Sequence, residues 1–185
     1  SEDWNLINRV ILPVISQTDI AGDSGNQFGL GDAVVSAFFS PKAPTSGGLI
    51  WGVGPVLSVP TATDKVLGSE KFGVGPTAIA LKQVGTLTVG LLVNHVWSVV
   101  GNEDRADVNN SFFQPFIAKN FPGGYAINAN TELAQNWDAD ATVGTINIGA
   151  SKVILRPASL AVFLMCLVRV FLPSTTIFPA SLIVL

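Results

Sequence analysis

The stretch YAINANTELAQNW, residues 125–137, decides the fold, because apolar and polar side chains alternate along it. Residues at alternate positions share a parity, and the two parities of this stretch differ. One parity is apolar or small, with Tyr125, Ile127, Ala129, Thr131 and Leu133, and the other includes the polar residues Asn128, Asn130 and Glu132. A period of two places successive side chains on opposite faces of a β-strand. The stretch therefore predicts a strand with one apolar face and one polar face.

Seven other segments show the same alternation, so the sequence predicts eight strands in all. The other seven cover residues 4–15, 28–39, 49–58, 72–82, 87–99, 111–119 and 142–153. In the least regular segment, 72–82, we assign Thr77, Ile79 and Leu81 to the apolar parity and Ala78, Ala80 and Lys82 to the other. Repeated amphipathic strands are typical of membrane barrels. We predict an all-β fold, an antiparallel up-and-down transmembrane β-barrel, with residues 1–153 as the wall of a single domain.

The composition favours a lipid-facing protein. Hydrophobic residues make up 48% of the chain and charged residues 12%, about half the charge of an ordinary soluble domain. A soluble β-sandwich with an unusually apolar core is the alternative. The net charge of −3, without a basic patch, argues against nucleic-acid binding. One cysteine and one histidine exclude a disulfide framework within one chain and a site built from several Cys or His ligands, and we expect no metal and no cofactor.

The connections between predicted strands alternate in length. Residues 16–27, 59–71 and 100–110 are long, whereas the connections around Gly85 and residues 122–124 are tight. Bacterial outer-membrane barrels have long outer loops and short periplasmic turns. Nine of the 13 acidic residues fall on the long-loop side, which predicts an acidic outer rim: Asp19, Asp23, Asp64, Glu70, Glu103, Asp104, Asp107, Asp138 and Asp140.

Polar residues on the parity opposite the apolar one are the candidate lumen lining. They are Arg9, Asp32, Asn94, Gln114, Asn128, Asn130, Glu132 and Asn147. Such groups need water or one another. They therefore line an aqueous path if the lumen is wide, or form a hydrogen-bonded plug if it is narrow.

Large aromatic residues lie near the strand ends on the apolar parity and are the candidate aromatic girdles. Trp4, Phe39, Trp51 and Tyr125 lie near the short-turn ends, and Trp97 and Trp137 near the long-loop ends. Two such belts suit a protein whose rings contact both lipid and headgroups.

Residues 154–185 do not follow the alternation. This hydrophobic tail has only two charges, Arg156 and Arg169, and its most helix-like part, residues 158–172, is short for a membrane helix. We interpret the tail as foreign to the barrel, for example the product of a frameshift or a misassembled gene end. The alternative is one extra hydrophobic hairpin with a turn near Pro173. Cys166 lies in this tail and is assigned no role.

His95 is the only candidate general base, and nothing in its spacing to Ser98 or Asp104 sets the geometry of a catalytic triad. We interpret it as an interfacial or capping residue and expect no enzymatic activity. The acidic cluster of residues 102–109 matches no calcium-loop spacing. We interpret it as a solvated loop, bridged by cations to neighbouring lipopolysaccharide.

Seven collinear stretches carry a resemblance to a known family. They are SEDWNLINRVILPV, FGLGDAVVSAFFSPKAP, GGLIWGVGPVLSVPTATD, LGSEKFGVGPTAIALKQ, LVNHVWSVVG, DVNNSFFQPFIA and NTE. Over residues 1–153 the chain resembles the bacterial outer-membrane barrels grouped with the MetA-pathway of phenol degradation, whose members are labelled as transporters and sometimes as "neuromedin U". The resemblance implies an exported barrel of Gram-negative bacteria that is larger than this chain, with N- and C-terminal strands missing here.

These observations give two expectations for function. The first is a porin-like channel or transporter of the bacterial outer membrane that passes small solutes and contacts lipid and lipopolysaccharide. The second is a closed structural or adhesive barrel that acts through its acidic outer loops.

Overall fold

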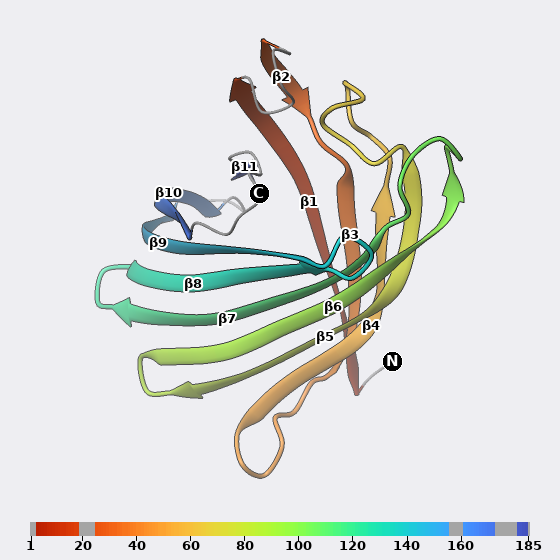
Figure 1. Ribbon diagram of the computed structural model, residues 1–185. Coiled ribbons are helices and arrows are strands. Elements are labelled where there is room, and N and C mark those ends of the chain that lie inside the picture. The colour runs from red at the N-terminus through yellow and green to blue at the C-terminus, as the bar shows by residue number, and fades with distance from the viewer. Residues whose placement is uncertain (1–2, 19–24, 156–160, 173–180, 185) are drawn as a thin grey trace.

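The computed structural model describes residues 3–18, 25–155, 161–172 and 181–184, and the described chain is built from eleven β-strands (Figure 1). The strands are β1 (Trp4–Thr18), β2 (Asn26–Leu30), β3 (Ala33–Pro41), β4 (Leu49–Val59), β5 (Lys71–Val84), β6 (Leu87–Gly101), β7 (Asn109–Phe121), β8 (Tyr125–Asn136), β9 (Ala141–Leu155), β10 (Ala161–Leu172) and β11 (Ser181–Val184). In the described part of the chain, no helix has the length and hydrophobicity needed to cross a bilayer.

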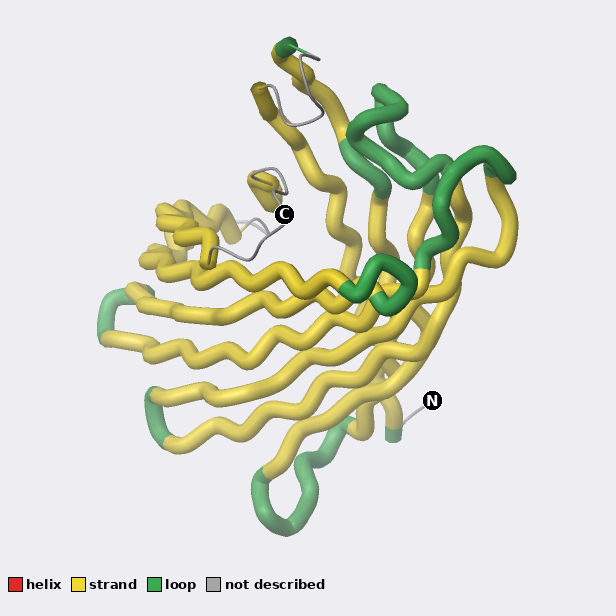
Figure 2. Tube along the Cα trace, in the orientation of Figure 1, coloured by secondary structure: helices red, strands yellow, loops and turns green. Residues whose placement is uncertain are grey.

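The strands form one antiparallel sheet in the order β10-β9-β8-β7-β6-β5-β4-β3-β1-β11, with β2 paired to β1. Nine of them, β1 and β3 to β10, are an up-and-down meander that curls through 282° into an open half-barrel (Figure 2). The predicted all-β, up-and-down antiparallel architecture is therefore confirmed. Strong right-handed twist in antiparallel strands produces this curling.

The eight predicted strands are present, but the second is divided. Residues 28–39 were expected as one strand, whereas the structure breaks at Gly31 and Asp32 between β2 and β3. The Gly31 N–H donates to Pro13 O (2.9 Å), and the Asp32 side chain bonds to the connection after β4. Tertiary hydrogen bonds thus override the local alternation at this point.

The curl separates a concave inner face from a convex outer face. On the inner face, Ser36, Phe38 and Val56 are only 0–2% exposed, and they pack where β3 meets β4. On the outer face, large apolar side chains are about half exposed along the strands, including Val89, Leu91, Phe113, Ile117, Ile127 and Ile148. The core therefore lies inside the curl, and the apolar parity of the sequence faces outward.

For residues 72–82, the prediction of which alternate side chains face outward is wrong. Thr77 pairs with Asn94 and Ile79 with Leu92, and Thr77 and Leu92 are buried on the inner face. Ala80 pairs with the exposed Leu91, so the alanine parity of β5 faces outward. The two sets of alternate side chains in β5 differ little in polarity, so pairing with β6 determines which set faces inward.

Two Gly-Pro pairs, Gly54-Pro55 in β4 and Gly75-Pro76 in β5, lie beside each other in the sheet. Pro55 pairs directly with Pro76. The β3–β4 ladder is interrupted opposite Pro55, and the β5–β6 ladder opposite Pro76, because proline has no N–H to donate. A Cβ on Gly54 would collide with Ala37 O, and one on Gly75 with His95 O. Glycine therefore lets the strand backbones approach closely here.

The connections alternate as predicted. The β5–β6 turn has Gly85 at φ 60°, and the β7–β8 turn has Gly123 at φ 82°, a left-handed conformation that glycine adopts without strain. The turn of residues 42–48 is exposed throughout, and its internal bonds run between Thr45, Gly48 and Leu49. The β4–β5 and β6–β7 connections are longer, and both lie at the other end of the strands (Figure 1).

Two strands come from the hydrophobic tail. β10 pairs with β9 over residues 161–172, and β11 pairs with residues 12–15 of β1. These two strands therefore extend opposite edges of the sheet. The predicted turn near Pro173 and the acidic residues Asp19 and Asp23 lie outside the described residues. The foreign origin of the tail stays a prediction.

Candidate functional site

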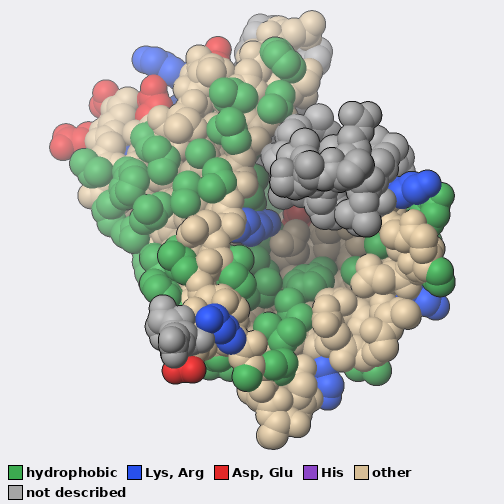
Figure 3. All heavy atoms as spheres, turned by 180° about the vertical axis from the view of Figure 1, so that it is seen from behind, with side chains coloured by type: hydrophobic (Ala, Val, Ile, Leu, Met, Phe, Trp, Pro, Cys, Tyr) green, Lys and Arg blue, Asp and Glu red, His purple; other side chains and the backbone are tan. Residues whose placement is uncertain are grey.

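The concave face encloses a cavity of about 250 Å³. Side chains from six strands line it, which places residues far apart in sequence around one space. Most of the lining is apolar, with Arg9, Ser58, Asn94, Asn110 and Ser111 as the polar exceptions. The space-filling view from behind shows the hollow, with a basic side chain inside it and an acidic one deeper (Figure 3).

Arg9 is the charged residue of this cavity. It extends from β1, where it pairs with the buried Ser36 of β3, so it belongs to the inner face. Glu132 acts on it electrostatically, but among the described residues no carboxylate lies within ion-pair distance of its guanidinium. A partly desolvated guanidinium without a close partner favours binding of an anion.

A ladder of amides and one carboxylate crosses the inner face from β7 to β9. Gln114 Nε2 donates to Glu132 Oε1 (3.1 Å) and more weakly to Asn130 Oδ1 (3.4 Å). Asn147 Nδ2 donates to the same Asn130 oxygen (2.8 Å), and Thr145 Oγ1 donates to Glu132 Oε2 (3.4 Å). We call Gln114, Asn130, Glu132, Thr145 and Asn147 the amide ladder. Its hydrogen bonds compensate for the burial of polar groups.

The inner face has more acceptor capacity than these bonds use. The Oδ1 atoms of Asn110, Asn128 and Asn147 are buried and have no hydrogen-bond partner among the described residues. Buried carbonyl oxygens are normally hydrogen-bonded. The sequence prediction of a polar inner parity is therefore matched by a face that is polar and closely packed at β7–β9.

The predicted lumen residues do not all meet in one place. Arg9 and Asn94 line the cavity, and Gln114, Asn130, Glu132 and Asn147 belong to the amide ladder. Asn128 lies on the same parity of β8, opposite Gly149. Asp32 differs, because it lies at the β2–β3 break and accepts hydrogen bonds from Ser69 N (2.7 Å), Ser69 Oγ (2.7 Å) and Ala62 N (3.2 Å).

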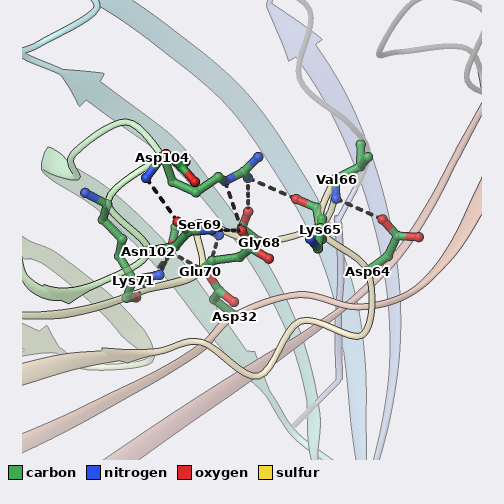
Figure 4. Close-up of polar contacts among 11 residues, drawn as sticks. Asp32, Asp64, Lys65, Val66, Gly68, Ser69, Glu70, Lys71, Asn102 and Asp104 are labelled. Atoms are coloured by element: carbon green, nitrogen blue, oxygen red, sulfur yellow. Dashed lines mark hydrogen bonds and ion pairs between the residues drawn. The ribbon is translucent and has the colours of Figure 1, made fainter.

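The two long connections, residues 60–70 and 102–108, are bonded to each other (Figure 4). Arg105 Nη2 donates to Gly68 O (2.6 Å) and Lys65 O (2.9 Å), and its Nε lies 3.6 Å from Glu70 Oε2. Asn102 Nδ2 donates to the same Glu70 oxygen (2.9 Å). Together with the Asp32 bonds, these contacts give the long-loop rim a defined shape.

The ion pair between Lys71 and Asp107 fastens the second connection to β5. Lys71 Nζ donates to Asp107 Oδ1 (2.6 Å), and Ser98 Oγ donates to the same oxygen (3.0 Å). The hydrogen bond from Lys71, aided by that from Ser98 and by the charge of Lys71, holds the pKa of Asp107 below its ordinary value. The carboxylate itself is well exposed.

The six predicted girdle residues are on the outer face or at its ends. Trp4, Phe39, Trp97, Tyr125 and Trp137 are among the exposed aromatics, and Trp51 is half-buried. Trp4 and Trp51 meet edge to face, with their ring centroids 6.1 Å apart. The outer face therefore carries aromatic side chains towards both strand ends.

His95 lies on the outer face, where it pairs with Ser111 of β7. His95 Nδ1 and Ser111 Oγ are 2.7 Å apart, and Trp137 Nε1 donates to the same hydroxyl (2.8 Å). The His95 and Trp97 rings are 4.1 Å apart, and the Nε2 atom of His95 is buried without a partner among the described residues. The interfacial or capping role of His95 stays a prediction.

The candidate lumen lining predicted from the sequence left out three polar residues of the inner face: Ser58, Asn110 and Thr145. Asn110 was left out because the predicted strand began at Ser111, one residue later. Thr145 lies within the predicted strand of residues 142–153 and shares the parity of Asn147. Extending the period-two pattern by one residue would have found Asn110. Among the described residues, no cluster of three or more His, Cys, Asp or Glu is arranged to hold a metal ion.

The chain matches no protein-family model, no curated protein and no solved structure.

Proposed function

We propose that this chain forms the wall of a bacterial outer-membrane β-barrel of the MetA-pathway group, through which small solutes pass. The observation that carries the proposal is the contrast between the two faces. Apolar side chains such as Leu91 and Ile148 are about half exposed on the outer face, and polar side chains lie inside. A folded protein in water rarely exposes so continuous an apolar surface, whereas a barrel in lipid requires one.

Closure of the ring is part of this proposal. In a bilayer every backbone N–H and C=O must be paired, so a sheet with free edges is not stable there. Further strands, from the same polypeptide or from another copy, would have to complete the half-barrel. Contacts with lipid and lipopolysaccharide would then involve the outer face and the acidic rim.

A closed structural or adhesive barrel is the second candidate, and the amide ladder favours it. The mutually bonded side chains of β7–β9, of which Thr145 and Asn147 are buried and the others half-buried, resemble a packed plug more than a water-lined wall. Planar-bilayer recordings of the full-length protein separate the two candidates. Discrete ion-permeable steps support passage, whereas a protein that inserts without conducting supports the closed barrel.

Membrane embedding is tested independently by Leu91→Arg and Val99→Arg, both on the exposed parity of β6. An arginine near the bilayer midplane costs about 2–4 kcal/mol of folding free energy, and one near the interface about 0–1 kcal/mol. We expect Leu91→Arg to destabilise the lipid-reconstituted protein by that larger amount and Val99→Arg to have little effect. Equal, small effects in lipid, or a monomer folded in detergent-free buffer, would refute the membrane location.

A further inference from the structure

We infer that Arg9 and the apolar wall around it form a binding site for a small organic carboxylate with an apolar body. This inference deepens the proposed function, because the ligand would be the class of solute that the barrel passes. It starts from the composition of the cavity. Ile11, Val34, Val96 and Phe112 line it together with Arg9. A cavity with mostly apolar walls and one cation fits an amphipathic anion.

The charge of Arg9 favours a carboxylate over an alcohol or an amine, although the lining also holds the Asn110 side chain, whose buried Oδ1 has no hydrogen-bond partner among the described residues. Neither Arg9 nor Asn94 makes a side-chain hydrogen bond with any described residue, although both line the cavity. A guanidinium and an amide are both hydrogen-bond donors, and a guanidinium binds a carboxylate through two parallel bonds. The same positive charge repels an ammonium group.

Glu132 limits the charge of the ligand. It is the carboxylate that acts electrostatically on Arg9, and it belongs to the amide ladder on the far side of the inner face. Because this carboxylate already offsets part of the positive charge of Arg9, a ligand with one negative charge fits better than a ligand with two. A singly charged carboxylate is therefore a better match than a phosphate monoester or a dicarboxylate.

The volume of the cavity limits the size of the ligand's apolar part. A cavity of about 150 Å³ with apolar walls holds benzene in an engineered protein. The cavity of about 250 Å³ here therefore has room for a body of similar size and a carboxylate. Phe112 and Val96 on neighbouring strands provide the apolar contact surface.

The test compares three ligands with the same body and different head groups. Hexanoate, hexanol and hexylammonium are titrated into the full-length protein in detergent micelles by calorimetry, with protein-free micelles as the blank. We expect hexanoate to bind at least about ten-fold tighter than hexanol, a difference of about 1.4 kcal/mol, and hexylammonium to bind most weakly. Equal affinities for hexanoate and hexanol would overturn the inference.

Substitutions test whether the preference for hexanoate over hexanol depends on the cavity around Arg9. Arg9→Gln should abolish the advantage of hexanoate over hexanol, and Asn94→Asp, which adds a negative charge to the wall of the same cavity, should do the same without weakening hexanol. Lys42→Gln removes a charge from the exposed turn of residues 42–48 and is the matched control, expected to bind like the wild type. If Arg9→Gln fails to fold, Asn94→Asp alone decides. An unchanged preference in the folded variants contradicts the site.

The failure of this inference is distinguishable from failure of the proposed function. A protein that conducts but binds hexanoate and hexanol equally retains the pore and loses the carboxylate site. A protein that prefers hexanoate through Arg9 but never conducts retains the site and loses the pore.

Discussion

The β3–β6 and β7–β9 parts of the sheet have the same apolar outer face but fill the inside differently. In β3–β6 the inner face is packed with small and apolar groups, and Val56 and Ser36 are almost completely buried. In β7–β9 the inner face carries the amide ladder. The glycines of the first part bring backbones together, whereas the amides of the second hold side chains in a bonded network.

The difference teaches that alternation determines which face a side chain occupies but not what fills the interior. Packing in β3–β6 depends on the absence of a Cβ at Gly54 and Gly75. Packing in β7–β9 depends on matched donors and acceptors. The first part should therefore respond most strongly to added volume, and the second to lost hydrogen bonds.

The largest effect is expected for Gly54→Ala. The new Cβ would collide with Ala37 O on the neighbouring strand, so the backbones of β3 and β4 must separate there. We expect a loss of about 3 kcal/mol or more of unfolding free energy, measured by urea titration of tryptophan fluorescence. Gly47→Ala in the exposed turn, where a Cβ has open space, is the control and should change stability little. Equal stabilities of the two variants would disprove the close approach.

Asn147→Leu should have the next largest effect. The side chain is 2% exposed, and its amide donates to Asn130, so leucine leaves this half-buried acceptor with only the weaker bond from Gln114. We expect a loss of about 1–3 kcal/mol in the same titration. Ile148→Leu, one residue along and facing outward, should be nearly neutral. An Asn147→Leu protein as stable as the wild type would mean that the ladder adds no stability.

The seam between the two parts is tested by Ser111→Ala. This residue joins β6 to β7 on the outer face, and its loss leaves both Trp137 Nε1 and His95 Nδ1 without their partner. We expect a cost of about 1 kcal/mol and a shift in tryptophan emission. Ser111→Thr, which keeps the hydroxyl, should restore the wild-type emission if the hydrogen bond is responsible.

The smallest effect is expected from acid at the β6–β7 connection. The folded-state pKa of Asp107 is lower than that of the unfolded chain, so its contact with Lys71 stabilises the loop at neutral pH. That contribution is lost as the pH falls from about 3.9, the ordinary Asp value, through the lower folded value. We expect an NMR titration of the Asp107 carboxyl to have a midpoint below 3.9. A midpoint at or above that value contradicts the ion pair.

Much of the fold could be predicted from the sequence because the strands are amphipathic. The pattern of residues 125–137 corresponds to β8, and the tight turn at Gly123 lies where it was expected. The phase of β5 could not be predicted, because Thr77 and Ala78 differ too little in polarity. The β2–β3 break depends on bonds from Asp32 to Ser69, residues that are far apart in sequence.

The candidate site was only partly predictable. The parity of Arg9 and Asn94 placed both on the inner face, but their meeting around one cavity depends on how far the sheet curls. Nor does any periodicity reveal the close backbone approaches at Gly54 and Gly75. The sequence alone therefore could not predict that the cavity and the amide ladder lie in different parts of the interior.

The exposed turn of residues 42–48 has a practical consequence. Its own bonds involve Thr45, Gly48 and Leu49, so a peptide tag inserted between Ala43 and Pro44 would break none of them. Exposed turns are the positions where insertions are best tolerated. Antibody access to such a tag in intact cells and in permeabilised cells would reveal which compartment this end of the sheet faces, and hence the orientation of the whole protein.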